Sequence, residues 1–581
     1  MKIDTPKVLR TDKLSVQLEN GFLRYIKWDG KEVLRMVYYT VRDENWDVIP
    51  QEIESIEINE IDEGFKVELN VKTVHPQIDF LWRCKIVARG SELTFDIQGE
   101  ALSNFTRNRI GLCILHPIET CKGKTVTLTH GNGTTSHNHF PKHISPNQPF
   151  QNISTMHWEL GKVTVNLQFK GDVFETEDQR NWLDASYKTY CTPLELPFPV
   201  LMKNGDKIHQ TVRLSISSED DVHGISKKDT YQLRLGDKYF QLPLLGLEAN
   251  TEYLGAYSLE KLKSLPLNHL RVEIRLSQSD WRLRLNQRLQ QSRLLRLPIE
   301  LVVYPYKNNH RKLLCFPWQG LQISSIIILS EKEKVISRSN LKNPLNDFRK
   351  AFPNISIGTG TDFFFTELNR NRPDTEGLDF LSFSSNAQIH ASDDLSIIET
   401  AQTYTDVLAT AHTFAQGLPI HISPVTLKPR SNPNATVSIS LEQQRLNRID
   451  IRQTKPLTAL WFLTSLKHLA QDKATQVTFF QTLGEEGVLM ADRRFAFTDF
   501  SIKENELFPI FHAMELLGRY SNWKLLQCTS SHPLLFEGLV FEKNQKREAI
   551  LLNFTNKAIR LQVEGESFVV SEKEWKVIAI G

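Results

Sequence analysis

The chain of 581 residues exceeds the size that one hydrophobic core normally fills, so about three domains are expected. Apolar residues make up 40% and charged residues 24%, which is the composition of an ordinary soluble globular protein. The net charge is +2, with Lys and Arg scattered among the acids, so composition argues against binding to nucleic acid or to an anionic membrane.

The chain shows neither a secretion signal nor a membrane-spanning segment. Its first residues, MKIDTPKVLRTDKLSV, lack the apolar core of a signal peptide, and no run of about 18 apolar residues occurs. The six cysteines are far apart and include no CxxC pair, which favours reduced, mostly buried thiols over a structural zinc site. We therefore expect a cytoplasmic protein.

Residues 1–220 are predicted to form an N-terminal β-sandwich. Segments such as KLSVQLENGFLRYIKWDG, FKVELNVKTV and VTVNLQFKGDVFE alternate apolar and polar residues and are rich in Val, Ile, Phe and Thr. Gly, Asn and Asp turns separate these segments at short intervals, which is the pattern of a sandwich. The segment KIHQTVRLSISS is expected to be the closing strand.

Residues 230–520 show a different sequence pattern, in which short apolar runs alternate with helix-compatible segments. The eight runs are LPLLGLEAN, NHLRVEIRL, PIELVVYP, LQISSIIILS, NISIGTGTDFFFTELN, LDFLSFSSNAQIHA, PIHISPVTLKPR and QVTFFQTLGEEG. Amphipathic segments such as SDWRLRLNQRLQQSRLL and LTALWFLTSLKHLAQ link them, and ELFPIFHAMELLGRY follows the last run. About 270 residues with this alternation predict a (β/α)8 barrel of the TIM type.

Residues 521–581 return to alternating strands, in PLLFEGLVFEKNQKREAILLNFTNKAIRLQV, and are predicted to form a small C-terminal β-domain. No internal repeat, coiled coil or low-complexity tract is found. The expected fold is therefore multidomain, of the α/β plus β class, in the order β-sandwich, barrel and β-domain.

The active sites of barrel enzymes lie at the carboxyl ends of the strands, so the polar residues at the ends of the eight runs are candidate site residues. The fifth run places Glu367 after an apolar stretch, with Asn369 and Arg370 in the loop that follows. The polar residues that end other runs are Glu248 and Asn250 (first), His390 (sixth), Arg430 (seventh), and Gln481, Glu485 and Glu486 (eighth). Such amide, guanidinium and carboxylate groups suit a polyhydroxylated ligand, because each buried hydroxyl needs a hydrogen-bond partner.

Each candidate also has a structural interpretation. Glu367 could pair with Arg370, His390 could be an ordinary loop histidine, and Glu485–Glu486 could be a solvated turn. Two other functions stay open: a barrel glycoside hydrolase that uses Glu367 with Glu485, and a non-catalytic carbohydrate-binding protein. The seventh run lacks the Glu that many retaining barrel glycosidases carry there, which counts against glycoside hydrolysis.

Metal and nucleophile motifs are absent from the sequence. No HxH begins a barrel strand, the HNHF segment at 137–140 lies in the sandwich, and no GxSxG elbow occurs. We therefore predict neither a metal nor a cofactor.

Several longer segments carry a resemblance to a known family. They are GFLRYIKWDGKEVLRMVYYTVRDENWD (21–47), RNRIGLCILHP (107–117), HISPNQPF (143–150), FETEDQRNWLDASYKTYCTPLELPFP (174–199), FFTELNRNRP (364–373) and ISPVTLKPR (422–430). These segments resemble the D-apionate lactonases. The resemblance implies a sandwich, a barrel and a β-domain, and the hydrolysis of D-apionolactone to D-apionate in the catabolism of apiose. Where the family pattern reads Glu-Thr-Thr-Gly, this chain has Gln481-Thr482-Leu483-Gly484.

Opening a lactone requires a base that activates water, support for the oxyanion, and an acid for the departing ring oxygen. We assign Glu367 as the base and His390 as the proton donor or carbonyl polariser. Arg370 or Arg430 would stabilise the negative charge and hold the carboxylate product. The substrate-binding candidates are Asn369, Arg370, Arg430, Gln481, Asp178 and Arg180. The expected partner is a small sugar lactone, and the oligomeric state stays open.

The segment TEDQRNWLDASYKTY (176–190) fits neither an amphipathic strand nor a surface helix. Its polar residues Asp178, Arg180, Asn181 and Asp184 are expected to form a network that either reaches the substrate or links the sandwich to the barrel.

Overall fold

The computed structural model describes residues 6–218, 231–307, 309–433, 440–491 and 503–581. The chain divides into two compact units. Of the described residues, the first unit contains 6–180 and 185–218, and the second contains 181–184 and everything from 231 onward.

The described part of the first unit consists almost entirely of strands, which form one hydrogen-bonded network of 17. The strands are β1 (Lys7–Arg10), β2 (Leu14–Glu19), β3 (Phe22–Trp28), β4 (Lys31–Asp43), β5 (Gln51–Ile61), β6 (Gly64–Thr73), β7 (Phe80–Arg89), β8 (Glu92–Ala101), β9 (Phe105–Pro117), β10 (Thr125–His130), β11 (Thr135–His139), β12 (Phe150–Leu160), β13 (Val163–Lys170), β14 (Phe174–Asp178), β15 (Ser186–Tyr190), β16 (Val200–Met202) and β17 (Lys207–Ser218). Short helical turns occur at α1 (Ile118–Cys121) and at η1 (Gln179–Trp182), of which Asn181 and Trp182 belong to the second unit.

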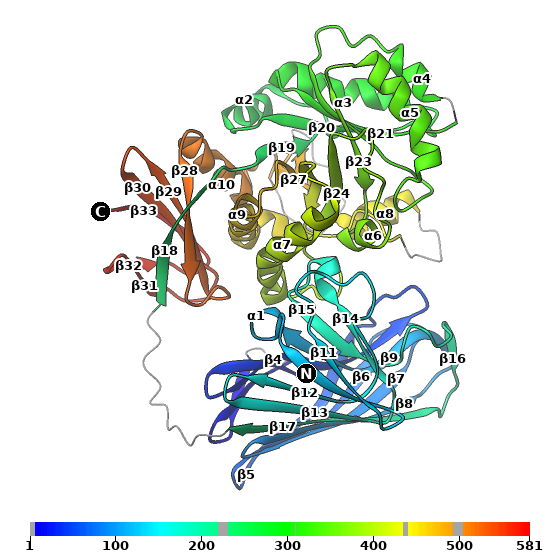
Figure 1. The fold of residues 1–581 in the computed structure, drawn as a ribbon, viewed down its shortest axis with the longest axis vertical. Coiled ribbons are helices and arrows are strands. Elements are labelled where there is room, and N and C mark those ends of the chain that lie inside the picture. The colour runs from blue at the N-terminus through cyan, green and yellow to red at the C-terminus, as the bar shows by residue number, and fades with distance from the viewer. Residues whose placement is uncertain (1–5, 219–230, 308, 434–439, 492–502) are drawn as a thin grey trace. The chain divides into compact units, whose positions relative to one another are not determined.

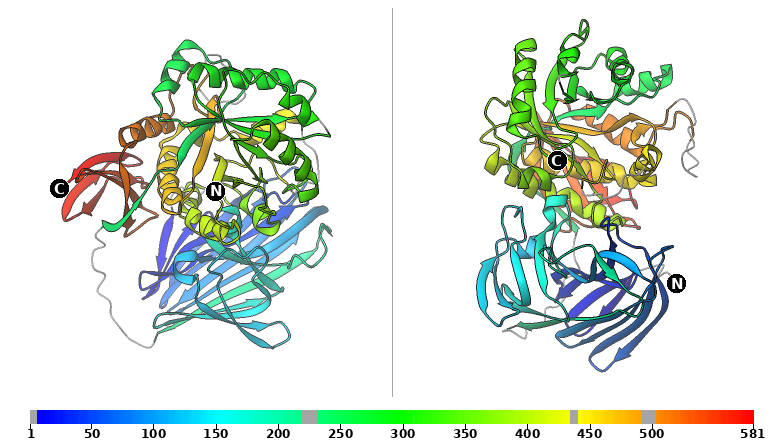
Figure 2. Two further views of the ribbon diagram at one scale, coloured as in Figure 1. Left: turned by 45° about the horizontal axis from the view of Figure 1, so that its top comes forward. Right: turned by 90° about the vertical axis from the view of Figure 1, so that its right-hand side faces the viewer.

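Alternation along these strands explains the core of the first unit. In β6 and β7 every second side chain is buried, because successive side chains of a strand point to opposite faces. The buried faces gather aromatic residues such as Trp82 and Phe95 into one large apolar cluster. Figure 2 shows these strands, coloured blue to teal, curving around a shared interior. The all-β prediction for this region is confirmed.

In the second unit, eight parallel strands close into a barrel, since each pairs with the next and the last pairs with the first (Figure 1). They are β19 (Leu244–Glu248), β20 (His269–Arg275), β21 (Ile299–Tyr304), β22 (Ile323–Ile328), β23 (Ser356–Thr361), β24 (Phe380–Asn386), β25 (Ile420–Thr426) and β26 (Gln476–Leu483). A short strand, β27 (Gly487–Leu489), lies beside β26. Each of the eight predicted runs contains one of these strands, so the predicted TIM barrel is confirmed.

Helices follow the barrel strands. They are α2 (Ala256–Ser264), α3 (Trp281–Leu295), α4 (Asn309–Leu314), α5 (Arg338–Ala351), α6 (Phe365–Arg370), α7 (Asp394–Phe414), α8 (Leu441–Arg448), α9 (Pro456–Gln471) and α10 (Pro509–Leu517), with short turns η2 (Ile451–Thr454) and η3 (Gly518–Tyr520). Local chemistry sets several of their starts: the Asp393 side chain caps α7, and α9 and α10 begin with proline, which suits a first helical turn. No described helix has the length and apolar character needed to cross a bilayer.

The C-terminal sheet has seven strands in the order β32-β31-β18-β28-β29-β30-β33. Their bounds are β18 (Tyr231–Phe240), β28 (Lys524–Ser530), β29 (Phe536–Lys543), β30 (Lys546–Asn553), β31 (Ile559–Val563), β32 (Glu566–Val570) and β33 (Trp575–Ile580). One of these strands, β18, lies within the range that the sequence assigns to the barrel. It instead pairs with β28 and β31, because strand alternation is a local signal that does not specify a distant pairing partner.

Candidate active site

Six charged side chains meet at the carboxyl ends of the barrel strands. In chain order they are Glu248 at the end of β19, Arg271, Glu273 and Arg275 on β20, Asp362 after β23, and Arg430 in the loop after β25. We call this group the charged cluster. The three charged residues of β20 alternate with apolar ones and reach residues from other strands, so they point into the barrel.

Arg430 bridges two carboxylates of the charged cluster. Its NH1 lies 2.5 Å from Asp362 Oδ1, and its NH2 lies 2.5 Å from Glu273 Oε2. Arg271 NH1 lies 2.9 Å from the same Glu273 oxygen and 3.2 Å from Glu248 Oε2. Since β20, β23 and β25 are not neighbours in the sheet, the two contacts of Arg430 span the mouth of the barrel.

The charged cluster is buried and electrically balanced, with three guanidinium groups and three carboxylates. Arg271 is fully buried, whereas the side chain of Arg275 is 33% exposed. Burial alone would raise the pKa of Glu273, but Arg430, Arg275 and Arg271 hold the pKa of that carboxyl well below its usual range. Buried ion networks add little net stability compared with apolar packing. A buried ion network at the carboxyl ends of the barrel strands, where barrel enzymes have their active sites, therefore indicates a functional site.

Neutral polar groups extend the charged cluster along adjacent strands. Asn250 Nδ2 donates to Gln481 Oε1 at 3.1 Å, and Gln481 is the Cα partner of Glu248 across the β19–β26 pairing. On the other side, the Arg275 guanidinium lies 3.9 Å from the centroid of the Tyr304 ring, a favourable cation–π arrangement. Arg430 and Gln481, both predicted from the sequence, therefore lie on one rim.

The two acids that follow β26 are paired with arginines from α8. Glu485 Oε2 lies 3.6 Å from Arg445 NH2, and Glu486 Oε1 lies 3.3 Å from Arg448 Nε. The two acidic side chains are only 7% and 16% exposed, so their interpretation as a solvated turn is wrong. Burial, opposed by Arg448, raises the pKa of Glu486.

His390 lies in the loop after β24 and forms a pair with Asp184. Its Nδ1 is 2.7 Å from Asp184 Oδ2, and both side chains are 14% exposed. The imidazole also meets the Trp182 ring edge-on, at a centroid distance of 5.2 Å. Residues 181–184 belong to the second unit, so these contacts are internal to it.

The residues around α6 make further contacts with the same short segment. Asn369 Nδ2 donates to Asn181 Oδ1 at 3.1 Å, and the Arg370 guanidinium lies 5.3 Å from the centroid of the Trp182 ring. Asn369 Oδ1 in turn accepts from Arg372 NH2 at 2.9 Å. The structure therefore groups His390, Asn369 and Arg370 around residues 181–184.

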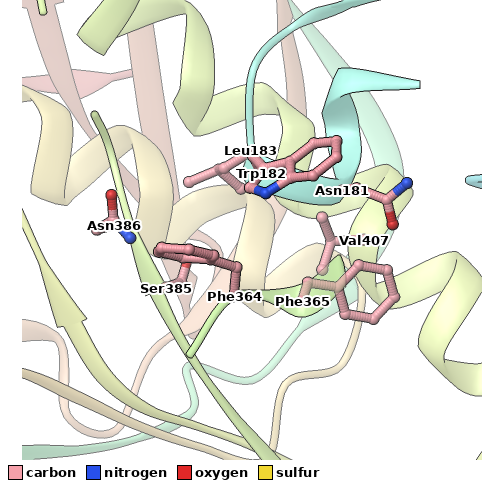
Figure 3. Close-up of a pocket in the computed structure, with 8 residues that line it drawn as sticks. All are labelled: Asn181, Trp182, Leu183, Phe364, Phe365, Ser385, Asn386 and Val407. Atoms are coloured by element: carbon pink, nitrogen blue, oxygen red, sulfur yellow. The ribbon is translucent and has the colours of Figure 1, made fainter. Parts of the chain in front are cut away.

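A small crevice lies beside this group (Figure 3). Its lining consists of Asn181, Trp182, Leu183, Phe364, Phe365, Ser385, Asn386 and Val407. Figure 3 shows the rings of Trp182 and Phe364 on opposite sides of it. The cavity volume is ≈ 10 Å³, which is room for about one water molecule, so the crevice in this conformation does not hold a sugar lactone.

Glu367 does not stand at a strand end as the sequence predicts. The fifth strand stops at Thr361, whose hydroxyl accepts from the backbone N–H of Phe363 at 3.2 Å and so forms a local turn. Glu367 then falls on α6, 3% exposed, with Oε1 3.3 Å from Lys334 Nζ. The glycosidase alternative pairs Glu367 with Glu485. In the structure the carboxylate of Glu367 binds Lys334, whereas that of Glu485 binds Arg445.

Asp178 and Arg180 lie in the first unit and bind each other. Arg180 Nε and NH2 donate to the two Asp178 carboxylate oxygens at 2.8 and 2.7 Å, and neither side chain is exposed. Arg180 also donates to the carbonyls of Pro141 and Lys142, at 2.8 and 3.1 Å. This buried pair anchors the chain just before residues 181–184, and a substrate contact by either residue stays a prediction.

Most residues of the charged cluster were not predicted from the sequence. Arg271, Glu273 and Arg275 stand within the second predicted run, whereas the candidates predicted from the sequence stand at or beyond the strand ends. The sequence did contain a signal for these three residues. Charged residues at every second position of a barrel strand lie on one face of it, and buried charges need partners of opposite sign. Asp362 was missed because the apolar Phe363–Phe365 stretch looked like the end of the fifth strand.

Comparison with known sequences gives two matches to family descriptions. "D-apionate lactonase, N-terminal domain" matches residues 2–219, and "D-apionate lactonase, TIM barrel domain" matches residues 244–522. A D-apionate lactonase of Brucella anthropi is 30% identical over 477 residues, which cover 78% of this chain and 77% of that protein.

Comparison with solved structures gives weaker similarities. A conserved exported protein from Bacteroides fragilis is matched at a TM-score of 0.42 and 7% identity, over 60% of this chain and 100% of that one. The glycoside hydrolase family 30 subfamily 8 xylanase Xyn30A from Clostridium acetobutylicum is matched at a TM-score of 0.38 and 10% identity, over 58% and 88% of the respective chains.

Proposed function

This chain belongs to the D-apionate lactonase family and is a lactone-hydrolysing enzyme, and from that premise we propose that it converts D-apionolactone to D-apionate. The observation that carries the proposal is the 30% identity to a D-apionate lactonase along 78% of the chain. We further propose that the reaction belongs to apiose catabolism and takes place in the cytoplasm.

We place the reaction at the mouth of the barrel, beside the charged cluster. Water adds to the carbonyl carbon of the lactone, and the carbonyl oxygen then becomes an oxyanion. Arg275 and Arg430 are the cations of the cluster with solvent-exposed surface, at 33% and 15%. Because Glu273 and Asp362 hold both guanidinium groups in place, the positive charge needs no rearrangement when the oxyanion forms. The same groups suit the carboxylate of the product.

Glu367 and His390 stay predictions for proton transfer. His390 has the geometry of an oriented imidazole, since the Asp184 carboxylate binds Nδ1 at 2.7 Å and so fixes the ring. The carboxylate of Glu367 is occupied by Lys334 and is 3% exposed, which leaves it little access to a water molecule.

The first test is a panel of aldonolactones, D-apionolactone among them, incubated with the purified protein with and without a chelator. Acid release is expected to be fastest from D-apionolactone, and a nitrophenyl glycoside is expected to release no nitrophenol. Release of acid from other lactones but not from D-apionolactone would contradict the proposed substrate while leaving lactone hydrolysis in place.

A further inference from the structure

We propose that Glu486 is the proton-transfer residue of the lactonase reaction, a role that rests on the proposed function. Glu486 follows β26 at the carboxyl end of the barrel, next to Gly487. Gly487 is the partner of Gln481, and Gln481 is the partner of Glu248. Three adjacent strands therefore bring Glu486 to the rim that carries the charged cluster.

The environment of Glu486 differs from that of the acids in the charged cluster. Glu273 binds all three arginines of the cluster, with contacts of 2.5–2.9 Å. Among the described residues, Glu486 has an ionic contact with Arg448 at 3.3 Å, and its carboxylate accepts no hydrogen bond. Its side chain is 16% exposed, compared with 3% for that of Glu367, so Glu486 is the more solvent-accessible of the two glutamates.

The charges that face Glu486 come from three elements. Arg448 and Arg445 lie on α8, Glu248 ends β19, and Arg430 follows β25. Burial has the largest effect and raises the pKa of Glu486, whereas the arginines hold the pKa of Glu273 low. The pKa values of these two carboxyl groups on one rim are therefore shifted in opposite directions, which suits them to different roles. Glu273 stays ionised and orients the arginines, and Glu486 can gain and lose a proton.

The step is a base-assisted addition followed by an acid-assisted elimination. The Glu486 carboxylate takes a proton from water as the water oxygen bonds to the carbonyl carbon of the lactone. The tetrahedral intermediate carries its negative charge on the former carbonyl oxygen, beside Arg430. When the C–O bond to the ring oxygen breaks, protonated Glu486 returns its proton to that oxygen, which becomes the hydroxyl of the product. The product acid then releases its proton to solvent.

The test compares Glu486→Gln with the matched control Glu252→Gln in the full-length protein. Glu252 is also a glutamate at a barrel loop, 4.0 Å from Arg445, and no role in the reaction is assigned to it. We expect Glu486→Gln to lower kcat/KM for D-apionolactone about 10²–10⁴-fold, and Glu252→Gln to keep wild-type activity. Formate added to Glu486→Ala is expected to restore part of the rate, as an external carboxylate.

The outcomes separate the two proposals. Near-normal activity of Glu486→Gln, or loss of activity in Glu367→Gln but not in Glu486→Gln, would overturn the role of Glu486. A wild-type protein that hydrolyses other lactones but not D-apionolactone would overturn the proposed substrate instead, and the variants would then be assayed on the lactone that is hydrolysed. Circular dichroism of each variant establishes that it is folded.

Glu486 also affects stability, in a direction that depends on pH. In an unfolded chain a glutamate ionises near about pH 4.3, whereas the folded protein raises the pKa of Glu486. The folded state therefore binds the proton more tightly, and stability falls as pH rises between the two pKa values. Glu486→Gln is expected to unfold at a higher temperature than wild type at pH 7, with the difference vanishing below about pH 4. Thermal unfolding from pH 3.5 to 7.5 measures this; a Glu486→Gln variant less stable than wild type at pH 7 would contradict it.

Discussion

Arg430→Met is expected to lower the free energy of unfolding by about 3–5 kcal/mol and kcat/KM for the lactone by about 10²–10³-fold. Arg430 is 15% exposed and bridges Asp362 and Glu273 across the barrel mouth. Without it, three buried carboxylates would share two guanidinium groups, and the excess negative charge would have no counter-ion. The oxyanion would lose one of its two accessible cations.

Two measurements separate these effects. Urea denaturation gives the change in unfolding free energy, and initial rates on D-apionolactone at a temperature where the variant is folded give the catalytic loss. The control is Arg338→Met, because Arg338 also pairs with two carboxylates, those of Asp374 and Glu376, but is 51% exposed. Solvent screening makes such pairs weak, so the control should change stability by less than about 1 kcal/mol. A folded Arg430→Met enzyme with wild-type kinetics would exclude Arg430 from the reaction.

Lys467→Met is expected to destabilise the protein by a similar amount, about 3–5 kcal/mol, without affecting the site. Lys467 on α9 and Glu537 on β29 form an ion pair in which both side chains are almost fully buried, at 2% and 4% exposure. Burial would lower the pKa of Lys467, but Cys528 and Glu537 keep it raised, so the lysine is charged. Removing the lysine would leave a buried carboxylate unpaired.

The double variant Lys467→Met with Glu537→Leu provides the control for this prediction. Replacing both charges by apolar groups removes the unpaired carboxylate, and such replacements are often neutral or stabilising. Urea denaturation of the wild type, both single variants and the double variant gives the coupling free energy of the pair. If the double variant is no more stable than Lys467→Met, the loss comes from altered packing rather than from the charge.

Local patterns predict the architecture well where the signal lies within one element. The run PIELVVYP contains β21, and LTALWFLTSLKHLAQ lies within α9, because apolar spacing and a leading proline act over a few residues. The strand β18 shows the limit of this reasoning. Its sequence is that of a strand, but its neighbours in the sheet are β28 and β31, which lie far along the chain.

The residues of the candidate site likewise include some that the sequence predicts and some that it does not. Arg430 and Gln481 could be found from their positions after or within predicted strands, and both lie on the rim of the barrel. Glu367 was placed wrongly, because three consecutive phenylalanines extend the apolar run beyond Thr361 while the hydroxyl of that threonine turns the chain toward α6. No local pattern distinguishes an apolar strand end from an apolar turn that is buried.

The sequence by itself determined the order of the barrel strands, the closed barrel and the family, since these depend on periodicity and on segments that are contiguous in the chain. Only the tertiary structure decided which charges meet. Asp362 and Glu273 stand 68 and 157 residues from Arg430, and a contact over such a separation exists only once the barrel has closed. The electrostatic state of Glu273 and Glu486 follows from that closure, because burial and neighbouring charges, rather than residue type, set the pKa of a carboxyl group.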